Sequence, residues 1–341
     1  MMNENNFDVR YKIQMKINDD KKIFYNGDII NGTITIKTDK IFSSIMLYIL
    51  KQEKCLIDSK MLERDSKINT KIYEVTESKN NILFDIKIPN DISPSFEFVT
   101  DKYQLYIKYY LFVEYKDLNF TSKNYISIFI KKIIKTNSEL SLRFESDISR
   151  LIFSQGNCIG TINLLKTNIK MGGMINFNIE IDNKSNFDVK NLKISLIREI
   201  NIKKDGMKKE NYLLSKCIIK WIIQKHSKNS CNFSLKIQDN ELNNINLEKW
   251  DSNFKNDMNY DQFFCSVSSE LFECNYFLKI TIYFSSFVKY NSRPRIIIPF
   301  KVCHEISEDL EEENKNNLMD YDTINITGIE SLDMKNNKKN I

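Results

Sequence analysis

The side chains that most often carry out chemistry in enzymes are scarce in this sequence. It contains two histidines, His226 and His304, and seven cysteines. His226 lies between Cys217 and Cys231, so a cysteine–histidine nucleophile or a small metal site would have to form there. We expect the segment Ser-Lys-Asn-Ser between His226 and Cys231 to be a turn, and the spacing matches no common ligand signature. We therefore predict no catalytic residue, no metal ligand and no enzymatic activity.

The glycine-containing segments do not predict a nucleotide site. The stretch "GNCIGT" at residues 156–161 lacks the Gly-Lys-Ser/Thr ending of a phosphate-binding loop. The stretch "MGG" at residues 171–173 precedes an alternating segment, which favours a turn. We therefore expect no cofactor. Acidic pairs are plentiful but have no supporting groups, so a β-sandwich enzyme with glycosidase-like acids is left only as an alternative.

One set of basic side chains could bind anions. Residues 9–17 carry apolar side chains at odd positions, which places Arg10, Lys12 and Lys16 on the opposite, solvent face of a strand. Lys108 has the same place in the alternating segment 105–113. Lys and Arg form charge-assisted hydrogen bonds with phosphate. These four residues are the predicted partner-binding set, and an ordinary solvated sheet face in a lysine-rich protein is the alternative.

Alternation of apolar and polar residues dominates the chain and predicts its fold class. Period-2 patterns occupy residues 9–17, 45–49, 82–88, 105–113, 192–196, 233–237 and 276–284. Each pattern is typical of a strand with one buried face and one solvent-exposed face, as in antiparallel sheets. Amphipathic helical stretches are nearly absent. We predict an all-β protein built from antiparallel β-sandwiches.

Composition and cysteine usage favour a protein of the cytoplasm. Apolar residues make up 42% and charged residues 28% of the 341 residues, which is ordinary for a globular protein of two domains. The cysteines are odd in number and form no CxxC pair, which fits a reducing compartment better than a disulfide framework. No apolar run approaches the ~18 residues of a membrane span. We expect a cytoplasmic location, with peripheral association at endosomes or the plasma membrane left open, and no nucleic-acid partner, because basic and acidic residues are intermixed.

The chain repeats itself at the spacing of a whole domain. "YNGDIINGTITI" at residues 25–36 is similar to "KMGGMINFNIEI" at residues 170–181. The similarity continues in the same order, from residues 45–49 to 192–196 and from 84–88 to 233–237. This predicts two similar sandwiches in tandem, with boundaries at 7–135 and 136–303.

The remaining residues, 304–341, form a polar tail that we expect to be disordered. The tail holds ten acidic residues and four lysines, a net charge of −6, and subtracting it from the total of +5 leaves +11 for the two sandwiches. We predict that its densest acidic run docks on the basic strand residues and competes with an anionic partner; a solubilising tail without contacts is the alternative. The run contains Glu308, Asp309, Glu311, Glu312 and Glu313.

Two groups of motifs resemble the arrestin family. "Y-x-G-D-x-I-x-G-x-I-x-I" followed by "IMLYILKQE", and "IPNDISPSFEFVTDKYQLYIKYYLFVEY", are similar to the arrestin N-domain. "IKMGGMINFNIEIDNKSNFDVKNLKISLIREI" and the closing "RIIIPFKV" are similar to the C-domain. The resemblance covers about 300 residues and is closer to alpha-arrestin-like proteins, although no Pro-Pro-x-Tyr motif occurs. The positions that carry the motifs are Gly27, Asp28, Gly32, Pro94, Phe96 and Gly172.

The resemblance implies an immunoglobulin-like tandem fold and an adaptor that links membrane-protein tails to trafficking or signalling proteins. It also implies that basic residues on the first strand meet phosphates on a partner's tail. An arrestin-fold subunit of a retromer-like sorting complex is a second hypothesis. A β-sandwich enzyme and a secreted adhesion module are further alternatives from other classes.

Overall fold

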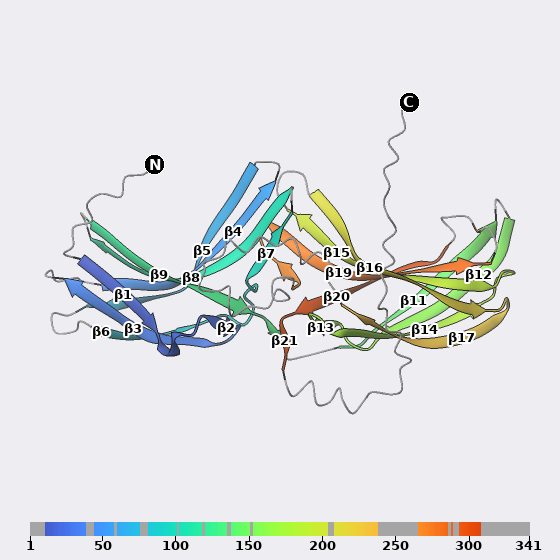
Figure 1. Cartoon of the computed structure of the whole chain (residues 1–341), viewed down its shortest axis with the longest axis horizontal. Coiled ribbons are helices and arrows are strands. Elements are labelled where there is room, and N and C mark those ends of the chain that lie inside the picture. The colour runs from blue at the N-terminus through green and yellow to red at the C-terminus, as the bar shows by residue number, and fades with distance from the viewer. Residues whose placement is uncertain are drawn as a thin grey trace.

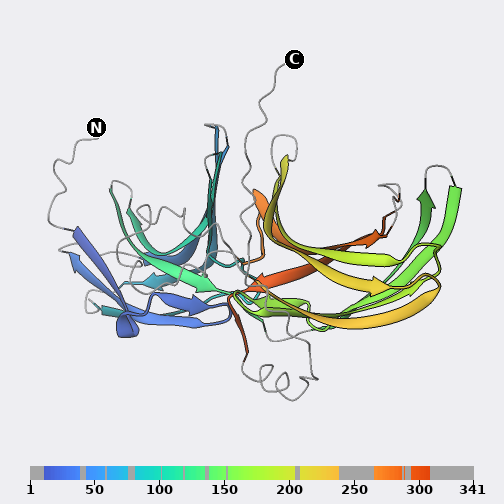
Figure 2. The same cartoon turned by 45° about the vertical axis from the view of Figure 1, so that its right-hand side comes forward.

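The structure is a computed structural model, and it describes residues 11–38, 44–57, 60–75, 81–100, 102–117, 120–134, 138–150, 153–203, 208–237, 265–285, 288 and 293–307. Within these ranges the chain forms strands and one short 3-10 helix, η1 (Asn18–Asp20). The strands build two sandwich-like bodies that lie side by side along the long axis of the molecule (Figures 1 and 2). The prediction of an all-β fold with two sandwiches is confirmed.

The first body pairs a three-stranded sheet with a six-stranded one. The smaller sheet has the order β1 (Tyr11–Ile17), β3 (Ile29–Thr38), β6 (Asn81–Lys87). The larger sheet has the order β2 (Ile23–Tyr25), β9 (Phe120–Lys131), β8 (Tyr103–Asp117), β4 (Ser44–Ile57), β5 (Lys60–Glu74), with β7 (Phe96–Val99) paired to β8. Burial alternates along these strands, as in β6, because one face of each sheet packs on the other.

The second body has the same plan. Its smaller sheet has the order β11 (Leu140–Arg150), β12 (Phe153–Leu164), β14 (Met174–Asn183), β17 (Ser227–Lys236). Its larger sheet has the order β13 (Asn168–Lys170), β20 (Arg295–Cys303), β19 (Phe272–Phe284), β15 (Val189–Ile202), β16 (Lys208–Ile223), with β18 (Val267–Ser268) paired to β19.

The internal repeat of the sequence corresponds to equivalent places in the two bodies. Residues 25–36 run from the end of β2 into β3, and residues 170–181 run from the end of β13 into β14. β2 and β13 each pair in parallel with the last long strand of their body, β9 and β20. Gly27 and Gly172 both adopt positive φ in the intervening turn, a conformation that glycine takes without steric cost. The predicted duplication therefore has a structural counterpart.

Two local predictions are wrong. The Ser-Lys-Asn-Ser segment is not a turn: it begins β17, and the turn lies one step earlier, where His226 has a φ of 55°. The residues just after His304 do not start a disordered tail. Glu305–Ile306 form β21, which pairs in parallel with β10 (Ile133–Ile134), and this pairing holds the end of the second body on the end of the first.

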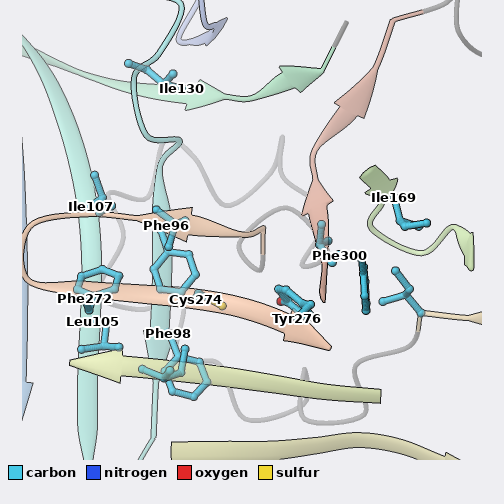
Figure 3. Close-up of a cluster of buried hydrophobic side chains, with 14 of the residues drawn as sticks. Phe96, Phe98, Leu105, Ile107, Ile130, Ile169, Phe272, Cys274, Tyr276 and Phe300 are labelled. Carbon is cyan, nitrogen blue, oxygen red and sulfur yellow. The ribbon is translucent and has the colours of Figure 1, made fainter. Parts of the chain in front are cut away.

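Aromatic residues from both bodies share one buried cluster (Figure 3). Phe96 of β7 is fully buried, and its ring lies 5.4 Å from that of Phe272 at the start of β19. Next to it, Phe98 lies 5.2 Å from Tyr212 of β16 in an edge-to-face arrangement. Buried Pro94 precedes β7, and Ser95 hydrogen-bonds Ile130, so the proline-bounded loop carries Phe96 into the junction.

Replacing Phe96 by alanine should lower the free energy of unfolding by about 3–5 kcal/mol, because a large, fully buried ring that serves both bodies is removed. Urea denaturation followed by tryptophan fluorescence measures the change. The matched control is Phe153→Ala, since the Phe153 side chain is 64% exposed and should change stability by less than about 0.5 kcal/mol. Equal effects of the two substitutions would contradict the anchor role of Phe96.

Candidate functional site

The structure separates the basic residues that the sequence grouped together. Lys16 lies on the outer face of β1, in the smaller sheet, with its ammonium 3.9 Å from Asp20. Lys108 lies on the outer face of β8, in the larger sheet, with its ammonium 4.8 Å from the centre of the Tyr106 ring. The outer faces of two packed sheets point in opposite directions. These two lysines therefore do not form one patch.

The remaining anion-site and tail predictions fall outside the described residues. This applies to Arg10, to the side chain of Lys12, and to the acidic run at residues 308–313.

The motif residues Asp28 and Gly32 have structural roles in the first body. The Asp28 carboxylate accepts hydrogen bonds from the Tyr25 N–H at 3.0 Å and from Lys21 at 3.3 Å. Gly32 lies under the Phe84 ring, where a Cβ atom would meet that ring at 2.5 Å.

The cysteines and histidines form no reactive group within the described residues. Burial raises the pKa of the Cys158 and Cys303 thiols to about 12, so these thiols stay protonated and weakly nucleophilic. His226 is exposed in a turn. In the same described ranges, no three His, Cys, Asp or Glu side chains are placed to hold a metal ion, and no helix is long and apolar enough to cross a membrane.

A buried carboxylate joins the two bodies. Glu53 of β4 is 2% exposed, and its Oε2 accepts hydrogen bonds from the backbone N–H groups of Glu270 at 3.1 Å and Leu271 at 3.4 Å. Lys51 lies against the same carboxylate from within the first body. Hydrogen bonds to a charged acceptor in a dry site are stronger than neutral ones. This contact therefore fixes the loop before β19 against β4.

A buried arginine is the residue that sequence reasoning missed. Arg198 of β15 is fully buried, with its guanidinium 4.6 Å from the Phe98 ring centre and 5.5 Å from that of Tyr212. The hydroxyls of Tyr103 and Tyr212 both donate to the Glu210 carboxylate. Burial, followed by the Glu210 hydrogen bond, raises the pKa of Tyr212. The sequence did hold one signal for this residue. In the alternating segment 192–200 the even-numbered side chains face the core, and Arg198 has an even number.

A third contact lies where the two chain segments at the junction cross. The Tyr25 hydroxyl donates to Glu305 at 2.7 Å, and Lys131 lies 3.3 Å from the same carboxylate. Buried His304 accepts a hydrogen bond from the Lys132 N–H at its Nδ1, and its ring lies edge-on to Phe129. Apolar packing, charge and backbone pairing therefore all act at one junction.

The outer face of the larger sheet in the first body is aromatic and internally charge-balanced. Phe112 stacks between Tyr48 and Tyr125, with ring centres 5.4 and 5.6 Å apart. The Glu114 carboxylate beside them lies 3.4 Å from Lys67 and 3.5 Å from Lys123. Further along the same face, Lys54 is 2.7 Å from Glu63. Lys54, Lys67 and Lys123 on this face therefore each have an acidic neighbour.

The outer face of the larger sheet in the second body contains a basic pocket of ≈ 220 Å³. Among the described residues that line it, four side chains are cationic and none is acidic, and the cations come from β15, from β19 and from the start of β20. The lining is formed by Lys193, Ser195, Ile197, Leu213, Lys279, Thr281, Tyr283, Arg293 and Arg295. The Arg293 guanidinium lies over the Tyr283 ring, 5.2 Å from its centre.

Removing the Tyr25 hydroxyl should lower the free energy of unfolding, and this loss should be larger at neutral pH than at acidic pH. Burial alone would raise the pKa of Glu305, but the Tyr25 hydrogen bond and the charge of Lys131 outweigh it and lower that pKa. A carboxyl group with a lowered folded pKa adds stability above its unfolded pKa of about 4.3, and this stability is lost as the pH falls through the folded value.

Tyr25→Phe should therefore cost about 1–2 kcal/mol at pH ~7 and clearly less at pH ~3.5, as measured by urea unfolding at both pH values. Tyr125→Phe is the control, because the Tyr125 side chain is 60% exposed. A loss of the same size at both pH values would show that the hydroxyl does not act through the ionised carboxylate.

One comparison with known proteins identifies the second body. A search of curated proteins finds no match. Residues 154–306 match the family model described as "Arrestin (or S-antigen), C-terminal domain". This range runs from β12 to β21 and includes the basic pocket, Arg198 and the second-body side of the junction. The resemblance noted in the sequence is thus confirmed for this half of the chain, and the protein carries an arrestin C-terminal domain.

Proposed function

We propose that this protein is an adaptor that binds cytoplasmic tails of membrane proteins and links them to trafficking or signalling proteins. The arrestin C-terminal domain supports a protein-binding role. The described residues supply binding groups on sheet faces and no set of side chains suited to a reaction. Burial raises the pKa of the Cys158 and Cys303 thiols, which makes these two side chains poor nucleophiles and further favours binding over catalysis.

The observation that carries the proposal is the basic pocket on the outer face of the second body. Lysine and arginine side chains from β15, β19 and the start of β20 converge there. The junction fixes this face relative to the aromatic face of the first body, so a partner could engage both at once. Two linked contacts raise affinity because the second forms at high effective concentration.

The basic residues of the first strand belong to the same proposal as a separate contact. Lys16 is exposed at the end of β1, near η1, and an exposed ion pair such as that with Asp20 is weak enough to exchange for a phosphate. A phosphorylated partner tail would gain a charge-assisted bond there. Lys108 would serve a different face.

Affinity purification of the tagged full chain from cells, followed by mass spectrometry, tests the adaptor role. We expect membrane receptors, transporters or coat proteins to be recovered, and we expect their recovery to fall when the wash salt is raised, since exposed charge contacts are screened. The tag alone is the control. Phosphatase treatment of the lysate measures how much of the recovery depends on phosphate.

Recovery of one salt-resistant complex of fixed stoichiometry would contradict the adaptor and favour the sorting-complex subunit. Recovery of no membrane protein and no trafficking or signalling protein under mild salt would contradict both hypotheses.

A further inference from the structure

The long edge strand of the second body, β16, has a regular pattern on its solvent-facing side. β16 comes last in the order of the larger sheet and pairs with β15. From Lys216 to Ile223 every even-numbered side chain is exposed, whereas the odd-numbered ones are half-buried or buried. The exposed side chains alternate between lysine and isoleucine and are Lys216, Ile218, Lys220 and Ile222. All four therefore belong to one face of one strand, at intervals of two residues.

The two isoleucines of this face present apolar surface to solvent. Ile218 is 61% exposed and Ile222 is 55% exposed. Leu213, which is 56% exposed, continues this surface toward the start of the strand. Large apolar side chains on an edge strand favour contact with another chain, because covering them removes apolar area from water.

The two lysines determine which chain can make that contact. Lys216 and Lys220 lie two positions to either side of Ile218, and neither forms an ion pair with a described residue. Lysines on an edge disfavour pairing with a strand that lacks acidic residues, because their charges would lose water without compensation. A strand with carboxylates opposite them is attracted instead. The lysines therefore select a partner by charge.

The backbone of an edge strand supplies the second part of such a contact. Alternate N–H and C=O groups of a strand point to the same side, so an edge strand has a row of them directed away from its sheet. An extended segment can hydrogen-bond to this row, and its alternate side chains then provide specificity. Its remaining side chains would lie over Cys217, Ile219 and Trp221, which are half-buried and pack against the core.

The spacing along β16 gives the sequence pattern of the partner. Residues directly opposite each other on paired strands have Cβ atoms about 4.5–5.5 Å apart. When one partner residue lies opposite Ile218, the residues two positions before and after it lie opposite Lys216 and Lys220. This holds in a parallel and in an antiparallel alignment. The matching pattern is therefore an apolar residue with an acidic residue two positions away on each side.

We propose that the outer edge of β16 binds an extended segment of a partner protein by strand addition, and that this segment carries an acidic, an apolar and an acidic residue at alternate positions. The acidic side chains pair with Lys216 and Lys220, and the apolar side chain packs on Ile218. This inference rests on the proposed adaptor role and names the chemistry of a partner. The contact requires no phosphate and is separate from that of Lys16.

Fluorescence anisotropy with the full chain tests the pattern. The probe is a labelled peptide, Thr-Glu-Thr-Ile-Thr-Glu-Thr, and the comparison peptide, Thr-Thr-Glu-Ile-Glu-Thr-Thr, has the same composition and charge. The two carboxylates of the comparison peptide cannot both lie opposite lysines, because they are two positions apart instead of four. We expect the probe to bind about tenfold more tightly. Equal binding of the two peptides, or no binding of the probe, would overturn the proposal.

Methylation of the peptide backbone tests strand addition itself. In an extended peptide the amides of the second, fourth and sixth residues point to one edge, and those of the third, fifth and seventh point to the other. Only one edge meets β16, so one set of N-methyl groups should abolish binding and the other set should leave it nearly unchanged. Equal effects of the two sets would show that the peptide does not add as a strand.

A charge swap separates this edge from general charge attraction. The double variant Lys216→Glu, Lys220→Glu should bind the probe about tenfold more weakly or worse, and should bind a peptide with lysine in place of both glutamates. Lys236→Glu, at the exposed end of β17 in the other sheet of the same body, is the control and should leave probe affinity unchanged. Circular dichroism checks the fold, and Lys220→Glu alone replaces the double variant if that variant misfolds. An equal loss in the Lys236 variant would contradict the assignment to β16.

Two other occupants of the edge give distinct outcomes. The tail carries the same pattern at Glu308, Leu310 and Glu312. Changing both glutamates to glutamine should leave probe affinity unchanged; a severalfold gain would show that the tail occupies the edge and would overturn the assignment to a partner. A dimer of the full chain that Ile218→Asp dissociates, as measured by light scattering, would assign the edge to a second copy. Recovery of membrane proteins from cells depends on none of these outcomes, so the adaptor role and the edge contact can fail separately.

Discussion

The rest of the structure depends on the packing of Phe96 against Phe272 at the junction of the two bodies. These rings are fully buried and come from opposite sides of the junction, so each ring helps to cover the other. Burial of such a ring contributes about 1.5–3 kcal/mol, and the Glu53 hydrogen bonds and the β10–β21 pairing add direction to it. The junction is therefore both apolar and specific in register. It fixes the orientation of the outer sheet faces of the two bodies relative to one another.

The duplication explains why the junction can be built from strand ends. In each body a short strand of the larger sheet leads through a glycine turn into a long strand of the smaller sheet, as β2–β3 and β13–β14 do. In each body a two- to four-residue strand, β7 or β18, pairs with a long inner strand of the larger sheet, β8 or β19. These short strands lie at the junction, where β7 supplies Phe96 and Phe98. Equivalent elements thus meet across the interface, but their side chains have diverged to fit one another.

The strands with one buried face could be predicted from the sequence, whereas the exposed edge strands could not. Strands such as β6 and β19 alternate apolar and polar residues because one face is buried, so their pattern reveals them. The edge strands β5 and β16 pair with a neighbouring strand on one side only. Most side chains of β5 are exposed, so its sequence shows no clear alternation of apolar and polar residues. The order from His304 to Ile306 was missed because it depends on pairing with Ile133 and Ile134, far earlier in the chain.

The pocket was hidden from sequence reasoning for a related reason, and its charges have a physical logic. Lys193, Lys279 and Arg295 are neighbours only through the register of β15, β19 and β20, which no local pattern shows. Like charges about 4 Å apart repel by only about 1 kcal/mol in water but by several times more in a partly desolvated site. An open sheet face therefore tolerates the cluster while water fills it. An anionic group bound among these cations offsets their mutual repulsion and is attracted more strongly at lower dielectric, so binding is favoured where this gain exceeds the cost of removing water from the charges.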